Sequence, residues 1–125
     1  MGMDVVILLV EDETLIREIM AESLAEDGFD VIQAASGDEA IALADSDCVP
    51  IDALVTDFHM PGETDGAEVA AHLRILHPAL PVIIASGRPD VIARSWDPEL
   101  GYRVLGKPYL PRHLLAMLRD VLPAA

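Results

Sequence analysis

Short apolar runs of the kind found in β-strands recur five times along the chain, and each is followed by a longer amphipathic stretch. The runs cover residues 5–10, 31–34, 53–56, 81–85 and 103–106. The first, third and fourth runs are almost entirely apolar, which is typical of central parallel strands that helices cover on both faces. The alternation therefore predicts an α/β fold, a doubly wound parallel sheet with helices on both faces and right-handed crossovers.

The stretches between the runs carry the start and stop signals of helices. The first helix is expected to end at Gly28, because glycine readily adopts the left-handed conformation that stops a helix. Ser36 precedes Glu39 by three residues, which predicts a capping box at the start of the second helix. The fourth helix, around residues 91–96, is expected to have two turns or fewer, because proline and glycine follow it closely. Helical stripes are formed by Leu15, Ile16, Ile19, Ser23 and Leu24, and by Leu110, Leu114, Met117, Leu118 and Val121.

The size and hydropathy of the chain are those of one domain. With 125 residues, of which 52% are apolar, the chain can close a single core. Its apolar stretches fall far short of the ~20 residues that a membrane-spanning helix requires, and the N-terminus lacks a signal-type segment. We therefore expect a soluble, cytoplasmic protein without membrane contact. The lone Cys48 cannot form an internal disulfide and is expected to be a small, partly buried residue.

Acidic residues dominate the charge of the chain. There are 22 Asp and Glu against 8 Lys and Arg, which gives a formal net charge of -14. Such a charge repels phosphate backbones and anionic lipid, so no direct binding to nucleic acid is expected. A cation such as magnesium, or a protein partner with a basic surface, fits this charge better.

Polar side chains follow the ends of four predicted strands. Glu11 and Asp12 follow the first run, Asp57 the third, Ser86 the fourth and Lys107 the fifth. Open α/β sheets form their sites at the carboxyl ends of the strands, near the point where strand order reverses. We therefore expect these five residues to converge on one crevice.

The combination of three carboxylates, a hydroxyl and an ammonium indicates metal-assisted phosphoryl chemistry. Carboxylates that lie close together raise one another's proton affinity unless a cation joins them, and magnesium prefers such oxygen ligands. One carboxylate can then attack phosphorus, while Lys107 and Ser86 contact the transferring oxygens. Each feature alone also has a simpler explanation: a solvated helix N-terminus for Glu11 and Asp12, a turn for Ser86 and a surface position for Lys107.

From Val6 to about Leu122, the chain resembles the receiver family of two-component response regulators. The resemblance rests on motifs that are specific in their order and spacing: Val10-Glu11-Asp12, Asp57-Phe58-His59-Met60-Pro61-Gly62, Ala85-Ser86-Gly87 and Lys107-Pro108. It implies a flavodoxin-like (βα)5 fold with strand order 2-1-3-4-5. It also implies one receiver domain over residues 5–122, with no output domain after it.

The resemblance assigns a role to each of these site residues. Asp57 would accept the phosphoryl group. Asp12, Asp57 and the backbone carbonyl of His59 would be direct magnesium ligands, and Glu11 would act mainly through metal-bound water.

The two remaining site residues would contact the transferred group: Ser86 would donate a hydrogen bond to one phosphoryl oxygen, and Lys107 would pair with another. The implied donor is a sensor histidine kinase or a histidine phosphotransfer protein. The implied output is a change in affinity for a downstream protein through the face of the fourth helix, fifth strand and fifth helix, or onward passage of phosphate as a shuttle or sink. Such a domain is a phosphoacceptor that promotes its own phosphorylation and dephosphorylation, not an enzyme with a separate substrate.

Two positions depart from the usual pattern of the family. Val104 stands three residues before Lys107, where most receivers have an aromatic residue that moves with phosphorylation. Tyr102 lies on the same side of the predicted strand and is predicted to take over part of that role. The loop at residues 62–66 is one residue longer than its commonest form, and its glycines should still allow it to close.

Two other functions fit parts of the sequence. A phosphatase of the haloacid-dehalogenase type also forms phosphoaspartate, but it requires a second aspartate where this chain has His59, and a cap domain for which there is no room. A receiver-like module that binds proteins without phosphate would fit Val104. It would have no need for the acidic pair, Asp57 and Lys107.

Overall fold

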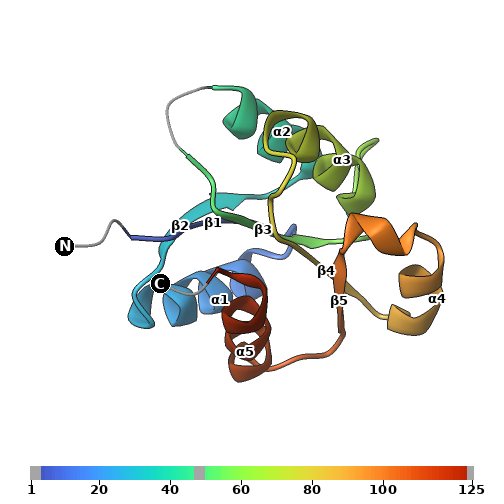
Figure 1. The fold of residues 1–125 in the computed structure, drawn as a ribbon. Coiled ribbons are helices and arrows are strands. Elements are labelled where there is room, and N and C mark those ends of the chain that lie inside the picture. The colour runs from blue at the N-terminus through green and yellow to red at the C-terminus, as the bar shows by residue number, and fades with distance from the viewer. Residues whose placement is uncertain (1–3, 47–49, 124–125) are drawn as a thin grey trace.

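A five-stranded parallel sheet in the order β2-β1-β3-β4-β5 forms the centre of the structure, a computed structural model that describes residues 4–46 and 50–123 (Figure 1). All four neighbouring strand pairs are parallel, which confirms the expected sheet and its order. Cys48 lies outside the described residues. The strands are β1 (Val6–Val10), β2 (Asp30–Ala34), β3 (Ala53–Asp57), β4 (Val82–Ser86) and β5 (Arg103–Gly106).

Helices cover both faces of the sheet, as the alternation of apolar runs predicted. In Figure 1, α1 and α5 lie on one face and α2 and α3 on the other, while α4 lies beside β4 and β5 near the edge of the sheet. No helix within residues 4–46 and 50–123 is long and apolar enough to cross a membrane. The helices are α1 (Thr14–Glu26), α2 (Gly37–Asp45), α3 (Gly66–Leu76), α4 (Pro89–Arg94) and α5 (Pro111–Val121), with a short 3-10 helix η1 (Pro98–Leu100) before β5.

Two hydrophobic layers, one on each face of the sheet, hold the domain together. Alternate residues of one strand enter different layers: Leu8 and Val10 of β1 pack with α2 and α3, whereas Ile7 and Leu9 pack with α1 and α5. Every residue of β3 and β4 is buried. The nearly continuous apolar runs therefore reflect burial on both faces.

The expected stripe of α1 was only partly right. Leu15 and Ile19 are 69% and 45% exposed, whereas Met20 and Leu24 are buried. Positions 16, 20 and 24 follow one another at intervals of four and face the sheet, so the line through 15 and 19 is turned toward solvent. The chain leaves α1 through Gly28, which has a positive φ of 96°, as expected for a helix stop.

The starts of α2 and α4 also differ in detail from the sequence predictions. Ser36 caps α2 by accepting a hydrogen bond from the Glu39 N–H at 3.1 Å, but the full capping box occurs at Asp65 and Glu68 of α3. The prediction that α4 has two turns or fewer is confirmed by its six residues. It begins earlier than expected, because Pro89 suits the first turn of a helix.

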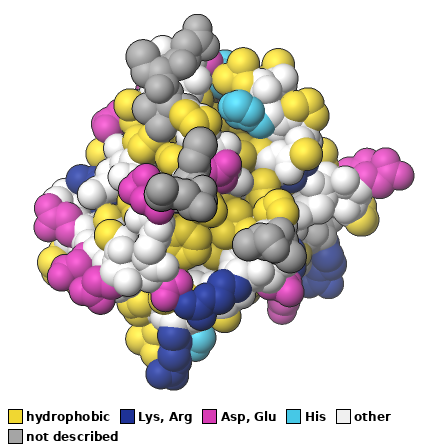
Figure 2. All heavy atoms as spheres, turned by 60° about the vertical axis from the view of Figure 1, so that its left-hand side comes forward, with side chains coloured by type: hydrophobic (Ala, Val, Ile, Leu, Met, Phe, Trp, Pro, Cys, Tyr) yellow, Lys and Arg dark blue, Asp and Glu magenta, His cyan; other side chains and the backbone are white. Residues whose placement is uncertain are grey.

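Figure 2 shows the side of the molecule near the two chain termini, where hydrophobic side chains lie between scattered Asp and Glu side chains. A cavity of about 460 Å³ on this side is lined by residues that precede β1, β3 and β4 and by the end of α5. Its described lining contains no Lys, Arg or His. The five polar residues of the sequence prediction lie at the other end of the sheet.

Gly66 begins α3 directly against the backbone of Asp57. A Cβ atom at position 66 would lie 2.1 Å from the carbonyl oxygen of Asp57, and the Gly66 N–H donates a 2.9 Å hydrogen bond to the carbonyl of Phe58. Only glycine allows the helix to approach the acceptor strand this closely.

We expect Gly66→Ala to lower the free energy of unfolding by on the order of 2–3 kcal/mol, because the added methyl group must push helix and strand apart. Gly87→Ala is the matched control, since a Cβ there meets nothing within 4 Å. Urea denaturation of both variants measures the difference. Equal stability of the two variants would contradict the assigned contact.

Candidate functional site

The predicted site residues converge at the carboxyl ends of the strands. Glu11 follows β1, Asp57 is the last residue of β3, Ser86 is the last residue of β4, and Lys107 follows β5. Asp57 and Ser86 are thus the last residues of their strands. The predicted runs ended one residue earlier and had placed both residues after the strand. Strand order reverses between β1 and β3, because β2 lies on one side of β1 and β3 on the other. In α/β sheets, ligand crevices form at the carboxyl ends of the strands at such a point.

Three carboxylates form a compact cluster at this edge. One oxygen each from Glu11, Asp12 and Asp57 lies within 4.8 Å of the other two. Glu11 and Asp57 are each 3% exposed, and Asp12 is half-buried. Glu11 Oε1 and Asp57 Oδ2 have no hydrogen-bond partner among the described residues. Buried carboxylate oxygens without donors are costly, so this cluster fits a bound divalent cation.

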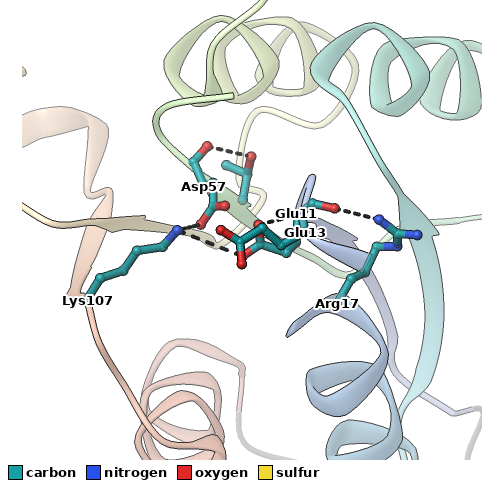
Figure 3. Close-up of polar contacts among 6 residues, drawn as sticks. Glu11, Glu13, Arg17, Asp57 and Lys107 are labelled. Carbon is teal, nitrogen blue, oxygen red and sulfur yellow. Dashed lines mark hydrogen bonds and ion pairs between the residues drawn. The ribbon is translucent and has the colours of Figure 1, made fainter. Parts of the chain in front are cut away.

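Lys107 provides the positive charge nearest to the cluster. Its Nζ lies 2.7 Å from Asp57 Oδ1 and 3.8 Å from Glu11 Oε1 (Figure 3). Burial lowers the pKa of Lys107, but the hydrogen bond and charge of Asp57, with the charges of Glu11 and Asp12, outweigh it and leave the pKa above its ordinary value. Lys107 is therefore a permanent cation that contacts one oxygen of Asp57 and leaves the other free.

Glu11 is unusually basic for a carboxylate. Burial, followed by the closeness of the Asp57 carboxylate and its negative charge, raises the pKa of Glu11 to about 8. The Glu13 N–H and the charge of Lys107 act in the opposite direction. Without a metal ion, Glu11 therefore releases its proton at a higher pH than an ordinary glutamate.

Sequence analysis missed Arg17, which holds the acidic loop from α1. Its Nη1 donates a 2.8 Å hydrogen bond to the carbonyl of Glu11, and its Nε donates to Gln33 Oε1 at 3.3 Å (Figure 3 shows the first contact). The Glu13 N–H donates to Glu11 Oε2 at 3.2 Å. A signal was present, because Arg17 is the one Lys or Arg among the first 73 residues of the chain.

Ser86 joins the ends of β4 and β5. Its carbonyl accepts a 2.8 Å hydrogen bond from the Lys107 N–H, and its Oγ accepts one from the Arg88 N–H at 3.0 Å. The side chain is 3% exposed. Because the hydroxyl oxygen is already an acceptor, its proton is available to a ligand in the crevice.

His59 lies in the loop after β3, with an exposed side chain that meets the ring of Phe58 edge-on at 4.7 Å. The structure brings together Glu11, Asp12, Asp57 and Lys107 and places Ser86 at the end of the neighbouring strand β4. The role expected of the His59 carbonyl stays a prediction. A cavity of about 350 Å³ opens beside the cluster and is lined by Glu11, Lys107 and mostly apolar neighbours, including Tyr109. Burial, then the charges of Asp57 and Glu11, raise the pKa of Tyr109.

Comparison with known proteins decides the family. The family profile described as "response regulator receiver domain" matches residues 7–119. The chain belongs to this family. The receiver domain is thus a component of two-component signalling, a phosphoacceptor signalling domain rather than a conventional enzyme.

Individual relatives agree with this assignment. The chain is 37% identical to the response regulator MprA of Mycobacterium bovis over 121 residues, covering 96% of this chain and 51% of MprA. It is 33% identical to the sensor kinase CckA of Brucella abortus over 117 residues, covering 93% of this chain and 12% of CckA. The receiver domain thus spans about half of one relative and a small part of the other.

A solved structure supports the same fold. The crystal structure of a response regulator receiver protein from Sinorhizobium medicae matches with a TM-score of 0.85 and 29% identity, covering 94% of each chain. Receiver domains bind magnesium at an acidic pocket and interact with kinases and downstream partners. The cluster of Glu11, Asp12 and Asp57 is the corresponding acidic group here.

The raised pKa of Glu11 predicts how the stability of the metal-free receiver domain depends on pH. Because this pKa rises from 4.5 to about 8 on folding, the folded state binds more protons than the unfolded chain between these values. The contribution of Glu11 to stability is therefore fully present below 4.5 and is lost as the pH rises through about 8.

Urea denaturation in the presence of a chelator, from about pH 5 to about pH 8, measures this loss. We expect the decline in stability to be shallower for Glu11→Gln, because glutamine does not titrate. Other acidic residues contribute equally to both proteins. Superimposable pH profiles of wild type and variant would show that Glu11 does not hold the proton.

Proposed function

We propose that Asp57 accepts a phosphoryl group from a histidine kinase or a histidine phosphotransfer protein, in a magnesium-dependent reaction. The observation that carries this proposal is the arrangement of the two Asp57 oxygens. One pairs with Lys107 at 2.7 Å, and the other lies near the carboxylates of Glu11 and Asp12 and has no hydrogen-bond partner among the described residues. A carboxylate held in this way has one oxygen to attack phosphorus and a neighbouring cation to stabilise the charge that develops.

The carboxylates at this edge suit a magnesium ion. We assign Asp12, Asp57 and the His59 carbonyl as direct ligands, and Glu11 as a residue that acts through metal-bound water. When bound, the ion supplies positive charge that offsets both the carboxylates and the oxygens of the phosphoryl group. The unpartnered oxygens of Glu11 and Asp57 support this assignment.

In the transfer step, the free oxygen of Asp57 forms a bond to phosphorus as the bond from phosphorus to the donor nitrogen breaks. The imidazole of the donor leaves with the electron pair and takes a proton from solvent. Lys107 then pairs with one phosphoryl oxygen, and the Ser86 hydroxyl donates to another. These contacts place charge and hydrogen-bond donors where the transition state needs them.

The same residues support loss of the group. Water attacks phosphorus, the bond from phosphorus to the Asp57 oxygen breaks, and the products are free carboxylate and inorganic phosphate. In this sense the receiver domain promotes both its own phosphorylation and its own dephosphorylation.

We further propose that residues 5–122 act in the cytoplasm as a switch for protein contacts, or as a shuttle or sink for phosphate. The face of α4, β5 and α5 is the surface assigned to a downstream protein, and β5 is an edge strand of the sheet. The net charge of -14 argues against direct binding to nucleic acid or membrane.

Intact mass measured after incubation with acetyl phosphate tests the proposal. We expect the wild type to gain one acid-labile phosphoryl group in magnesium and none in chelator, and Asp57→Asn to gain none. A folded wild type that takes up no phosphoryl group would favour the phosphate-independent binding module.

Lys107 is expected to act on the rate of uptake. Replacing it by glutamine removes the charge that faces Asp57, and we expect Lys107→Gln to slow phosphoryl uptake on the order of 100-fold, as for loss of a transition-state donor. Arg112→Gln removes one positive charge from the exposed surface of α5 and serves as the control. Equal slowing in both variants would point to net charge rather than to the contact with Asp57.

A further inference from the structure

A line of aromatic contacts leads from the residue after Asp57 to the start of β5. The rings of Phe58 and Trp96 meet edge-on with centroids 6.0 Å apart, and Trp96 meets Tyr102 edge-on at 5.4 Å. The Arg74 guanidinium lies 5.0 Å from the centroid of the Tyr102 ring. The line therefore connects the acceptor loop, the segment after α4, the start of β5 and α3.

Phe58 is fixed to the acceptor strand at its backbone. Its N–H donates a 2.9 Å hydrogen bond to the carbonyl of Ala85, and its carbonyl accepts one from the Gly66 N–H at 2.9 Å. Phe58 also shares a peptide bond with Asp57. The Phe58 ring thus lies in contact with Trp96 on a backbone that is fixed to the acceptor strand.

Trp96 lies in the segment that joins α4 to β5; Figure 1 shows this segment beside the edge strand β5. Within residues 95–101, it is the one side chain that is not exposed to solvent. The preceding α4 has six residues and buries Ile92 alone. A segment with so few buried contacts has low local stability, so its position depends on where the Trp96 ring packs.

The far end of the line, at Tyr102 and Arg74, also has contacts of its own. Tyr102 is half-buried and packs against the same hydrophobic layer as Phe58 and Trp96. Arg74, which stacks on it, also donates a 2.7 Å hydrogen bond from Nε to the carbonyl of Leu80. Val104, the next residue on this side of β5, carries no ring, so the aromatic connection runs through Tyr102.

We propose that Phe58, Trp96 and Tyr102 couple the chemical state of Asp57 to the segment between α4 and β5, with Trp96 and Tyr102 as positioning residues for the acceptor loop. This inference rests on the proposed phosphoacceptor function. Coupling is reciprocal, so a group that binds at Asp57 must change the surroundings of Trp96, and loss of the Tyr102 ring must change binding at Asp57.

The first test measures binding of beryllium fluoride, which mimics a phosphoryl group on a carboxylate, by calorimetry in magnesium. Without the Tyr102 ring the loop loses support and must be ordered on binding, so we expect Tyr102→Leu to bind roughly fivefold more weakly than wild type. Tyr102→Phe keeps the ring and is expected to retain the wild-type affinity.

Phe29→Leu is the structural control, because Phe29 packs in the opposite hydrophobic layer, away from the site. Urea denaturation measures the loss of stability in each variant, so that a change in binding can be separated from general destabilisation. Weaker binding in Tyr102→Leu but not in Phe29→Leu supports the coupling. Equal affinity in the two leucine variants would overturn it, and tighter binding in Tyr102→Leu would overturn the assignment of Tyr102 as a positioning residue that supports the loop.

The second test uses the single tryptophan of the chain, whose emission reports on residue 96 alone. We expect emission to change when wild type binds magnesium and beryllium fluoride, and to stay constant in Asp57→Asn. Binding without a change in emission would refute the coupling while leaving the phosphoacceptor function intact. A wild type that neither binds beryllium fluoride nor takes up a phosphoryl group would refute both.

Discussion

Two carboxylates buried beside each other at the end of the central strands are the constraint on which the rest of the site depends. Glu11 and Asp57 cannot both carry an uncompensated charge in this environment. In the metal-free receiver domain, Lys107 supplies positive charge beside Asp57, and the raised pKa of Glu11 favours a bound proton there. A divalent cation at the same oxygens would displace that proton, so metal loading and proton release at this site are thermodynamically linked.

The parallel sheet explains how residues so far apart in sequence meet. Asp57 pairs in register with Ala85, and Ser86 pairs with Gly106. The ends of β3, β4 and β5 therefore lie at nearly the same level across the sheet, and Asp57, Ser86 and Lys107 are close to one another along the strand direction. Local contacts then refine the arrangement. Arg17 holds the carbonyl of Glu11, and Gly66 lets α3 start against the backbone of Asp57.

Apolar periodicity was sufficient to predict the layers and the five strands. The spacing of the polar residues also predicted that Glu11, Asp12, Asp57 and Lys107 would lie close together, as they do in the structure. The strand order came from the family resemblance, because periodicity does not say which strands are neighbours. The same limit explains Leu15 and Ile19, since an apolar pattern does not decide which of two adjacent lines on a helix faces the sheet. Arg17 and Trp96 escaped notice for another reason. Their roles depend on a backbone carbonyl and on ring contacts between distant segments, which apolar periodicity does not predict. For Arg17, the lack of any other Lys or Arg in this part of the sequence was the one available signal.

The hydrogen bond from Gly66 to the carbonyl of Phe58 closes residues 59–65 into a loop with a fixed base. The entropy of closing such a loop changes little when one residue is added, so the extra residue here leaves Asp57 in its place. This loop is consequently a region in which evolution can alter length and side chains beside the acceptor without dismantling it.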